Sequence, residues 1–308
     1  MTIVVPVRNR ATLVLRTLES IKAQTWRPLK VIVVDNGSTD GTRESVAGWM
    51  DANRADDFEL ELLEEPRPGA AVARNCGLEA VDTRLMMFFD SDDIMLPQHV
   101  ATVMRRFHAG DDPDLVLFRV KAHSIKGSDR ITKSPGSDPM MTHIFHSLLF
   151  TLGYACETAL ARRAGGWDEQ TRGWDDLEFG SRVLMEARRR VSIPDVNVEV
   201  FEHVESITGA DFSTRRGQWE LVLDKMEKNF EKSRHKNRER WIRGVVYRRV
   251  ILAAFYHREE APVEARRLFG EAISHPLLSP LQRAALRIAY HYTKLGGRGA
   301  SIFVGPFL

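Results

Sequence analysis

The chain opens with two short apolar runs separated by an amphipathic stretch of helical length. Residues 2–5 and 31–34 are continuous and mostly β-branched, as in strands that are buried on both faces. Between them, residues 11–24 carry Leu15, Leu18 and Ile21 at helical spacing. A strand, a helix and a strand in this order indicate a parallel sheet with helices on both faces. This pattern restricts the fold to the α/β class.

The same alternation continues to about residue 120. It predicts strands at residues 58–63, 85–89 and 115–120 and a helix over residues 69–80. In sheets of this kind, ligands collect at the carboxyl ends of the strands. Three polar segments follow strands in this way: Pro6 to Asn9, Asp35 to Ser38, and Asp90 to Asp92. We therefore expect a binding site at this edge of the sheet.

The turn after Phe88 and Phe89 is strongly acidic. Asp90, Asp92 and Asp93 crowd three carboxylates into four residues, which is unfavourable unless a cation or strong hydrogen-bond donors neutralise them. Asp90 and Asp92 offer the hard oxygen ligands that Mg²⁺ or Mn²⁺ prefers, and such an ion suits a diphosphate. The alternative is a solvated acidic turn before the helix that begins near residue 97.

Charge divides the chain into two parts. Residues 1–212 contain 25 Lys and Arg against 33 Asp and Glu, whereas residues 213–308 contain 19 against 9. The second part is helical in pattern, with helices predicted at residues 214–232, 238–257, 261–274 and 279–294. We predict one domain over residues 1–210 and a basic helical extension over residues 211–308.

Location and partners are constrained by what the sequence lacks. Cys76 and Cys156 have no metal-type spacing, and no signal peptide is evident, so a reducing cytoplasm is expected. No apolar run reaches the roughly 20 residues of a membrane-spanning helix, so membrane contact is expected to be peripheral, at the inner face. No nucleic-acid motif accompanies the basic charge, so nucleic acid is not expected as a partner.

The basic extension leaves three alternatives open. Around Trp241, arginines interleave with apolar residues, so one face can rest on the domain of residues 1–210 while the arginines meet solvent. The same pattern suits attraction to an anionic bilayer or to a lipid diphosphate. A homodimer contact is the third alternative. Core packing is the expectation that we favour.

Five segments in order resemble the motifs of a family 2 glycosyltransferase with the glycosyltransferase A fold. The resemblance covers residues 2 to about 207 and implies a mixed, mostly parallel sheet flanked by helices. It also implies the inverting transfer of a hexosyl or N-acetylhexosaminyl group from a nucleoside diphosphate sugar to a glycan or lipid-linked acceptor. Processive members carry Gln-x-x-Arg-Trp and membrane helices, which this chain lacks, so one sugar is expected per encounter. The five segments are Val4-Val5-Pro6-Val7-Arg8-Asn9, Val33-Val34-Asp35-Asn36-Gly37-Ser38-Thr39-Asp40-Gly41-Thr42, Ala73-Arg74-Asn75-Cys76-Gly77-Leu78, Asp90-Ser91-Asp92-Asp93 and Asp175-Asp176-Leu177-Glu178.

The resemblance assigns donor and metal contacts to particular residues. Asp90 and Asp92 match the Asp-x-Asp motif that binds a divalent Mn²⁺ or Mg²⁺, and Arg74 would contact the base or the diphosphate. Asn36 stands where the family more often has aspartate, and its carbonyl can still accept the imide N–H of uracil, which keeps a UDP-sugar as the expected donor. The remaining expected donor contacts are Pro6, Asn9, Asp35 and Ser91.

Two of these assignments have plainer alternatives. Arg74 would be a surface arginine on its helix. Asp35 and Asn36 would only form a turn, with Thr39 or Asp40 capping the next helix.

The resemblance also places the acceptor side and a further metal ligand. Asp176 is expected to be the general base, with Asp175 and Trp174 beside the acceptor. Alternatively the two acids merely begin a helix and Trp174 belongs to the core. His203 would complete the metal shell or bond the diphosphate, unless it is a surface histidine.

Two other classes were compared with the transferase. A nucleotidyltransferase should show a Gly-rich signature early in the chain, and residues 7–11 lack glycine. A non-catalytic glycan-binding or scaffold protein would have lost its acids, whereas Asp90, Asp92 and Asp176 are all present.

Overall fold

The computed structural model describes residues 1–125, 127–202 and 212–307. The chain divides into two compact units. Unit 1 comprises Met1–Ser137 and Leu148–Val204, and unit 2 comprises Asp138–Ser147 and Glu205–Leu308. The short segment Asp138–Ser147 thus belongs with the C-terminal helices, although about 60 residues of unit 1 follow it in the sequence. The boundary near residue 210 expected from the sequence stays a prediction.

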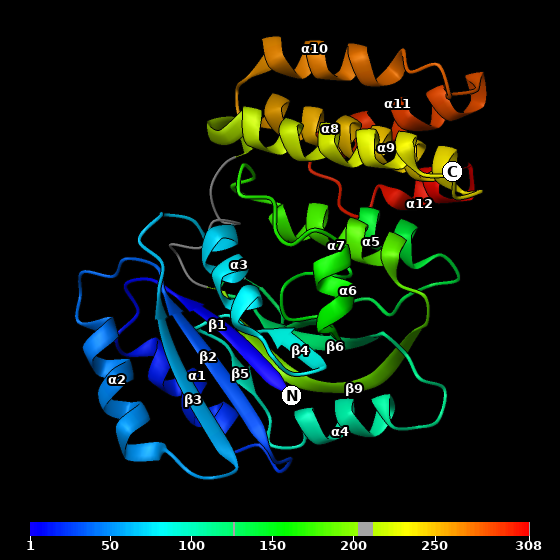
Figure 1. Ribbon diagram of the computed structural model, residues 1–308. Helices are drawn as coiled ribbons and strands as arrows, with labels where there is room; N and C mark the ends of the chain where they lie inside the picture. The colour runs from blue at the N-terminus through cyan, green and yellow to red at the C-terminus, as the bar shows by residue number, and fades with distance from the viewer. Residues whose placement is uncertain (126, 203–211, 308) are drawn as a thin grey trace. The chain divides into compact units, whose positions relative to one another are not determined.

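Unit 1 is built on one mixed sheet (Figure 1). The strands in chain order are β1 (Thr2–Val7), β2 (Leu29–Asp35), β3 (Phe58–Glu64), β4 (Leu85–Phe88), β5 (Ile94–Met95), β6 (Leu115–His123), β7 (Arg130–Ile131), β8 (Tyr154–Glu157) and β9 (Arg190–Phe201). Among the described residues the sheet order is β3-β2-β1-β4-β8-β6-β9-β5, with β7 paired to β6. The first four strands in this order run parallel, and β8 is antiparallel to both β4 and β6.

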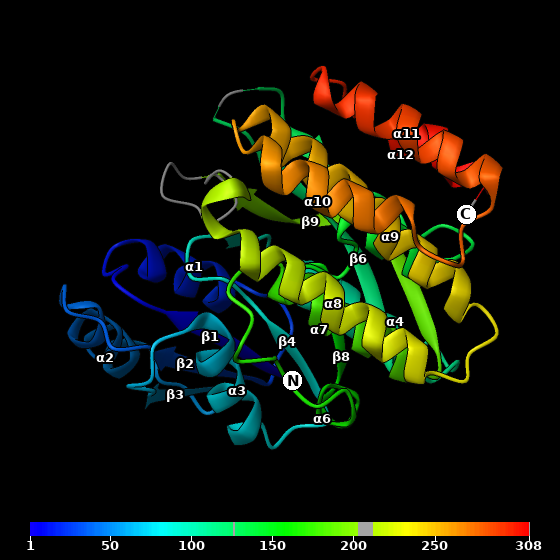
Figure 2. The ribbon, with the colours of Figure 1, turned by 90° about the horizontal axis from the view of Figure 1, so that it is seen from above.

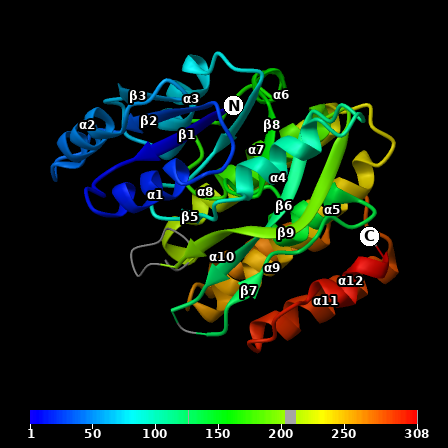
Figure 3. The same ribbon diagram turned by 90° about the horizontal axis from the view of Figure 1, so that it is seen from below.

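Helices cover both faces of this sheet. The helices of unit 1 are α1 (Leu13–Lys22), α2 (Thr42–Asn53), α3 (Ala70–Ala80), α4 (His99–Phe107), α6 (Thr158–Arg163) and α7 (Asp175–Glu186). Residues of α1, α2 and α4 share one apolar core with Ile3 and Val5 of β1, on the side seen in Figure 3. Helix α3 packs on the other face, against Val4 and Val34. The α/β fold expected from the sequence is confirmed.

The contact between α3 and β1 is close enough to require glycine. A Cβ added at Gly77 would lie 2.3 Å from Val4 Cγ1 and 3.2 Å from Val34 Cγ2. These distances are shorter than van der Waals contact, so a larger residue would push the helix off the sheet. This packing fixes the position of α3, which carries Arg74 on its buried side.

Unit 2 is helical, as the sequence predicts. Its helices are α5 (Pro139–His146), α8 (Arg216–Lys232), α9 (Arg238–Arg258), α10 (Pro262–Ile273), α11 (Pro280–Lys294) and α12 (Ser301–Val304), with 3₁₀ turns at Phe212–Arg215 and Gly305–Phe307. Helix α9 contacts α5, α8, α10 and α11, and Figure 2 shows α8, α9 and α10 side by side. Among the described helices, none is both long and apolar enough to cross a membrane.

Core packing explains the interleaved pattern of α9. Trp241, Val245 and Val250 are buried, and the Arg249 guanidinium pairs with Asp224, at 2.8 Å, and with Glu227 of α8. Gly244 permits the approach of α5, since a Cβ there would lie 3.1 Å from Met141 Cε. Helix α9 is therefore packed at the centre of unit 2. Its Arg249 is paired with α8, whereas the sequence pattern predicts that these arginines meet solvent.

Candidate functional site

The loops after β1 and β2 are joined by hydrogen bonds. Asn9 adopts a left-handed backbone conformation, with φ of 51°. Its N–H donates to Ser38 Oγ at 2.9 Å, and its Oδ1 accepts the Thr39 N–H at 2.8 Å. The predicted donor contacts Asn9 and Asp35 therefore lie at the carboxyl ends of neighbouring parallel strands.

Asp35 and Asn36 differ in whether their side-chain hydrogen-bonding atoms are already satisfied within the protein. Asn36 Nδ2 donates to the carbonyls of Glu65, at 2.8 Å, and Arg67, at 2.7 Å, while its Oδ1 accepts the Gly69 N–H at 2.8 Å. Asn36 thus holds the loop that leads into α3. Asp35 is 2% exposed, and its Oδ1 has no hydrogen-bond partner among the described residues. A buried carboxylate oxygen without a partner at this edge is a candidate acceptor for a hydrogen bond from a ligand.

Arg74 links two acidic segments that are far apart in sequence. Its Nη2 lies 3.0 Å from Asp90 Oδ1, and its Nη1 lies 2.9 Å from Asp175 Oδ2. The guanidinium also lies over the Trp167 ring, 4.5 Å from its centroid. Arg74 is only 8% exposed, so it is not a surface arginine. Although burial opposes the charge, the Asp90 and Asp175 carboxylates keep the pKa of Arg74 above its usual value.

The three acids of the turn after β4 have different environments. Asp90 binds Arg74, and Asp92 Oδ2 forms an ion pair with Arg10 Nη1. Asp93 is 3% exposed and its Oδ1 accepts the Phe201 N–H at 2.9 Å. Burial, together with the nearby Asp90 and Asp92 charges, raises the pKa of Asp93 to about 8. Asp93 is therefore a structural residue that is largely neutral at pH 7.

Helix α7 begins with the pair of acids expected on the acceptor side. Trp174 precedes it in a left-handed conformation, with φ of 52°, and turns the chain into the helix. Asp175 receives Arg74, whereas Asp176 Oδ1 accepts the N–H of Leu177 at 2.7 Å. Desolvation and the adjacent Asp175 carboxylate raise the pKa of Asp176 to about 7. A carboxyl with this pKa can take up a proton near neutral pH.

Residues around α7 hold this arrangement in place. Glu178 is 2% exposed and accepts two hydrogen bonds from Arg182, at 2.7 and 2.5 Å. Arg182 also donates to the Gly166 carbonyl at 2.7 Å. Trp167 packs edge-on against Phe88 of β4 and beside Phe179 of α7. The tryptophan under Arg74 is thus anchored to both segments that the arginine joins.

Sequence reasoning missed two arginines of this site. Arg10 follows the first strand, and its pairing with Asp92 spans 82 residues. The Arg16 guanidinium reaches the same turn and donates to the Asp92 carbonyl at 2.8 Å. The sequence around a loop arginine does not indicate which residue it pairs with. The pairing of Arg10 with Asp92 follows only from the adjacency of β1 and β4 in the sheet.

The described residues supply two carboxylates of the predicted metal site. In the described part of the chain, no three His, Cys, Asp or Glu side chains gather as a metal site. His203, the expected third ligand, lies outside the described residues. The turn still offers the Asp90 and Asp92 carboxylates, and Mg²⁺ is commonly held by one or two carboxylates plus phosphate oxygens and water. This donor set fits an ion that arrives with a diphosphate.

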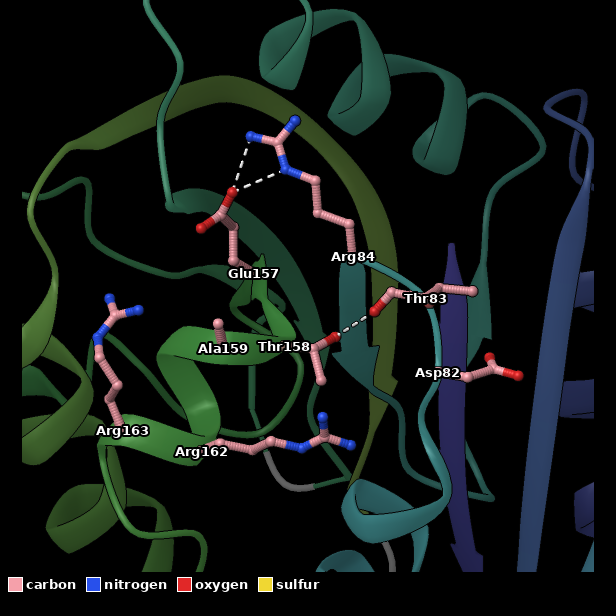
Figure 4. A pocket seen from close by; sticks show the side chains of 8 residues that line it. All are labelled: Asp82, Thr83, Arg84, Glu157, Thr158, Ala159, Arg162 and Arg163. Carbon is pink, nitrogen blue, oxygen red and sulfur yellow. Dashed lines mark hydrogen bonds and ion pairs between the residues drawn. The ribbon is translucent and has the colours of Figure 1, made fainter.

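A separate hollow of about 740 Å³ lies at the opposite end of β4 (Figure 4). Thr83 and Arg84 precede that strand, whereas Asp90 follows it. Arg84 Nε donates to Glu157 at 2.8 Å, and Thr158 Oγ1 donates to the Thr83 carbonyl at 2.7 Å. Two pairs of lining residues are thus hydrogen-bonded to each other, and the hollow is not the site predicted from the sequence.

Comparison with known sequences gives a consistent picture. The profile of the Glycosyl transferase family 2 matches residues 2–165. A validoxylamine A glucosyltransferase of Streptomyces hygroscopicus subsp. limoneus is 28% identical over 218 residues, which cover 59% of this chain and 47% of that protein. A pre-mycofactocin glycosyltransferase of Mycobacterium tuberculosis is 27% identical, with 66% and 42% covered. The chain spans about half the length of these curated relatives.

Solved structures share the fold. S. aureus TarS 1-349 in complex with UDP-GlcNAc matches with a TM-score of 0.74 and 17% identity, covering 96% of this chain and 87% of that one. The mannosyltransferase PcManGT from Pyrobaculum calidifontis, in complex with GDP-Man and Mn²⁺, matches with a TM-score of 0.62 and 21% identity, covering 99% and 82%. At these identities the matches establish the fold.

Proposed function

Because this chain belongs to glycosyl transferase family 2, we propose that it moves one sugar from a nucleoside diphosphate sugar to a glycan or lipid-linked acceptor. The observation that carries the proposal is the buried Arg74, which joins the acidic turn after β4 to the acidic start of α7. In this proposal, Asp90 on the donor side and Asp175 on the acceptor side share one guanidinium. A UDP-sugar is the donor class that we propose, and the UDP-GlcNAc complex of TarS supports it.

Donor binding is assigned to the edge formed by β1, β2 and β4. Asp35, with its unmet Oδ1, would accept a hydrogen bond from the nucleoside, and Pro6, Asn9 and Ser91 would shape the same edge. Asn36 is assigned a supporting role, because its amide already binds three backbone groups. This assignment weakens the sequence argument that Asn36 itself reads uracil.

A divalent cation, Mn²⁺ or Mg²⁺, would be held by Asp90 and Asp92 with oxygens of the donor diphosphate. When bound, the cation neutralises negative charge that develops on the departing diphosphate. The Mn²⁺ in the PcManGT complex supports this proposal. Arg10 and Arg74, which pair with the two acids, would remain beside the phosphates as additional positive charge. His203 as a further ligand remains a prediction.

Asp176 is proposed as the general base. It would accept the proton of the acceptor hydroxyl while the hydroxyl oxygen bonds to the anomeric carbon and the bond to the diphosphate breaks, which inverts that carbon. A pKa of about 7 suits this task, since the carboxylate is substantially ionised at neutral pH and basic enough to hold the proton. Trp174 and Asp175 would border the acceptor.

A pair of carboxyl variants in α7 tests the base assignment. Asp176→Asn should reduce turnover at least a hundredfold while leaving donor affinity, measured by calorimetry, within about twofold. Glu186→Gln removes an exposed carboxylate from the last turn of the same helix and should leave turnover unchanged. Full turnover in the Asp176→Asn variant would remove the base assignment.

The donor is identified by a hydrolysis screen of nucleotide sugars with and without Mn²⁺. Release of UDP from one sugar nucleotide, abolished by a chelator and restored by Mn²⁺, is the expected result. If the protein bound no donor and left all of them intact, the non-catalytic glycan-binding or scaffold alternative would take the place of this proposal.

A further inference from the structure

Helix α11 carries an exposed apolar stripe. Leu281, Ile288, Tyr292 and Leu295, the last just past the helix end, are 61%, 55%, 39% and 86% exposed. At 100° per residue these four positions fall within about 60° of the helix circumference. Single exposed apolar residues are ordinary, but an aligned row over the length of a helix marks an interaction surface.

Leu281, Ile288 and Leu295 of the stripe are not needed to hold the helix in place. Tyr292, by contrast, packs on Phe303 of α12, and its hydroxyl donates to the Arg298 carbonyl at 3.2 Å. The other side of α11 supplies Leu286, Ala289 and Tyr290 to the core of unit 2, and all three are buried. The helix start is fixed by a capping box, in which Ser279 Oγ accepts the Gln282 N–H and Gln282 Oε1 accepts the Ser279 N–H. Helix α11 therefore has one apolar face for its own core and a second one that faces outward.

Adjacent segments also expose apolar residues. Helix α12 contacts α11, and its Ile302 is 76% exposed. Phe307, in the following 3₁₀ turn, is 43% exposed, and its carbonyl accepts a hydrogen bond from Gln282 Nε2 at 2.7 Å. Ile302 and Phe307 are therefore further exposed apolar residues on segments that contact α11.

Every formal side-chain charge in this part of the chain is positive. Residues 272–308 contain no Asp or Glu and carry Arg283, Arg287, Lys294 and Arg298. Arg287 and Lys294 are seven residues apart, so they form a row along the helix, about 100° round its circumference from Ile288 and Leu295 of the apolar stripe. Arg283 is turned back to the Ile273 and His275 carbonyls, at 3.1 and 3.2 Å. Basic residues flanking an apolar stripe are typical of helices that lie in the surface of an anionic bilayer.

From this stripe and its flanking positive charges, we propose that α11 binds unit 2 to the surface of an anionic lipid bilayer. The apolar stripe would enter the boundary between headgroups and acyl chains, and Arg287, Lys294 and Arg298 would contact the anionic headgroups. A second copy of the chain is a poorer occupant, because a symmetric contact through this segment would bring two sets of like charges together. The surface differs from α9, whose Arg249 is paired within unit 2.

Sedimentation with lipid vesicles tests this proposal on the full chain. The protein should pellet with vesicles of roughly 70:30 phosphatidylcholine and phosphatidylglycerol, far less with pure phosphatidylcholine, and less as salt is raised. Changing Arg287 and Lys294 together to Gln should weaken binding about thirtyfold, since each basic residue near an anionic surface contributes roughly a factor of five. Changing Leu281, Ile288 and Leu295 together to Ser should weaken it at least tenfold.

Matched control variants test whether vesicle binding depends on the α11 residues themselves or on the total charge and exposed apolar area of the protein. Arg105→Gln with Lys133→Gln removes two exposed charges from unit 1, and Ile131→Ser removes an apolar side chain that is 48% exposed there. Both controls should bind vesicles as the parent does. Circular dichroism and donor hydrolysis should be unchanged in all four variants, because the altered residues lie outside the core and the candidate site.

Three results would overturn the proposal. The first is no vesicle binding by the parent protein, and the second is equal binding by the parent and both α11 variants. The third is a dimer, measured by light scattering, that the Ser variant dissociates, since it would assign the stripe to a second copy. None of these results would bear on the glycosyl transfer proposed for unit 1, which the donor screen tests separately.

Discussion

Replacing Arg74 with Gln removes the side chain that joins the two acidic segments of the candidate site. In the parent protein the guanidinium lies 3.0 Å from Asp90 and 2.9 Å from Asp175, and it covers the Trp167 ring. Gln is neutral and shorter, so it can satisfy at most one of the two carboxylates. The variant leaves both acids without their buried counter-ion.

The size of the effect follows from how far those acids are buried. Removing one member of a fully buried ion pair costs about 3 to 5 kcal/mol. The Asp90 and Asp175 side chains retain 29% and 20% of their exposure, so water can partly replace the arginine. We therefore expect a loss of about 2 to 3 kcal/mol in the free energy of unfolding of unit 1, including the lost contact with Trp167.

Urea unfolding followed by tryptophan fluorescence measures this loss. Arg106→Gln is the matched control, because Arg106 forms a two-bond ion pair with Asp111 at the surface, where such pairs contribute about 0 to 1 kcal/mol. Arg74→Lys keeps the charge but cannot span both acids, so it should fall between Gln and the parent. An Arg74→Gln protein that unfolds at the same urea concentration as the parent would refute this account of the site.

Four further predictions concern three single residues. Turnover should fall as the pH drops through about 7, where Asp176 is protonated, and a pH–rate profile with no acidic limb near 7 would contradict this. Because the folded-state pKa of Asp176 is raised, its contribution to stability is present at low pH and is lost as the pH rises through about 7. Asp176→Asn should therefore unfold at higher urea than the parent at pH 8 but not at pH 4. Gly77→Ala should lower the stability by about 1 to 3 kcal/mol through overpacking against Val4, whereas Gly48→Ala, with open space around its Cβ, should not. Asn36→Ala should leave the Glu65 and Arg67 carbonyls without the amide N–H that they accept. It should therefore weaken binding of the nucleotide sugar at least fivefold, measured by calorimetry.

The sequence alone determined the framework of unit 1. The strands expected at residues 58–63, 85–89 and 115–120 are observed as Phe58–Glu64, Leu85–Phe88 and Leu115–His123. Hydrophobic periodicity and strand ends are local properties, so they can be read without knowing the fold. The same reasoning placed polar segments at the carboxyl ends of β1, β2 and β4, and the structure brings these ends together at one edge.

What those polar residues do was decided by tertiary structure. Asp90, Asp92 and Asp93 look alike in sequence, yet one binds Arg74, one binds Arg10 and one is buried against the Phe201 backbone. The partners are 16, 82 and 108 residues away, and no local pattern encodes such distances. The exposed stripe of α11 is likewise decided by tertiary structure. Apolar residues lie on more than one face of that helix, and only packing shows which of them unit 2 covers and which it leaves facing outward.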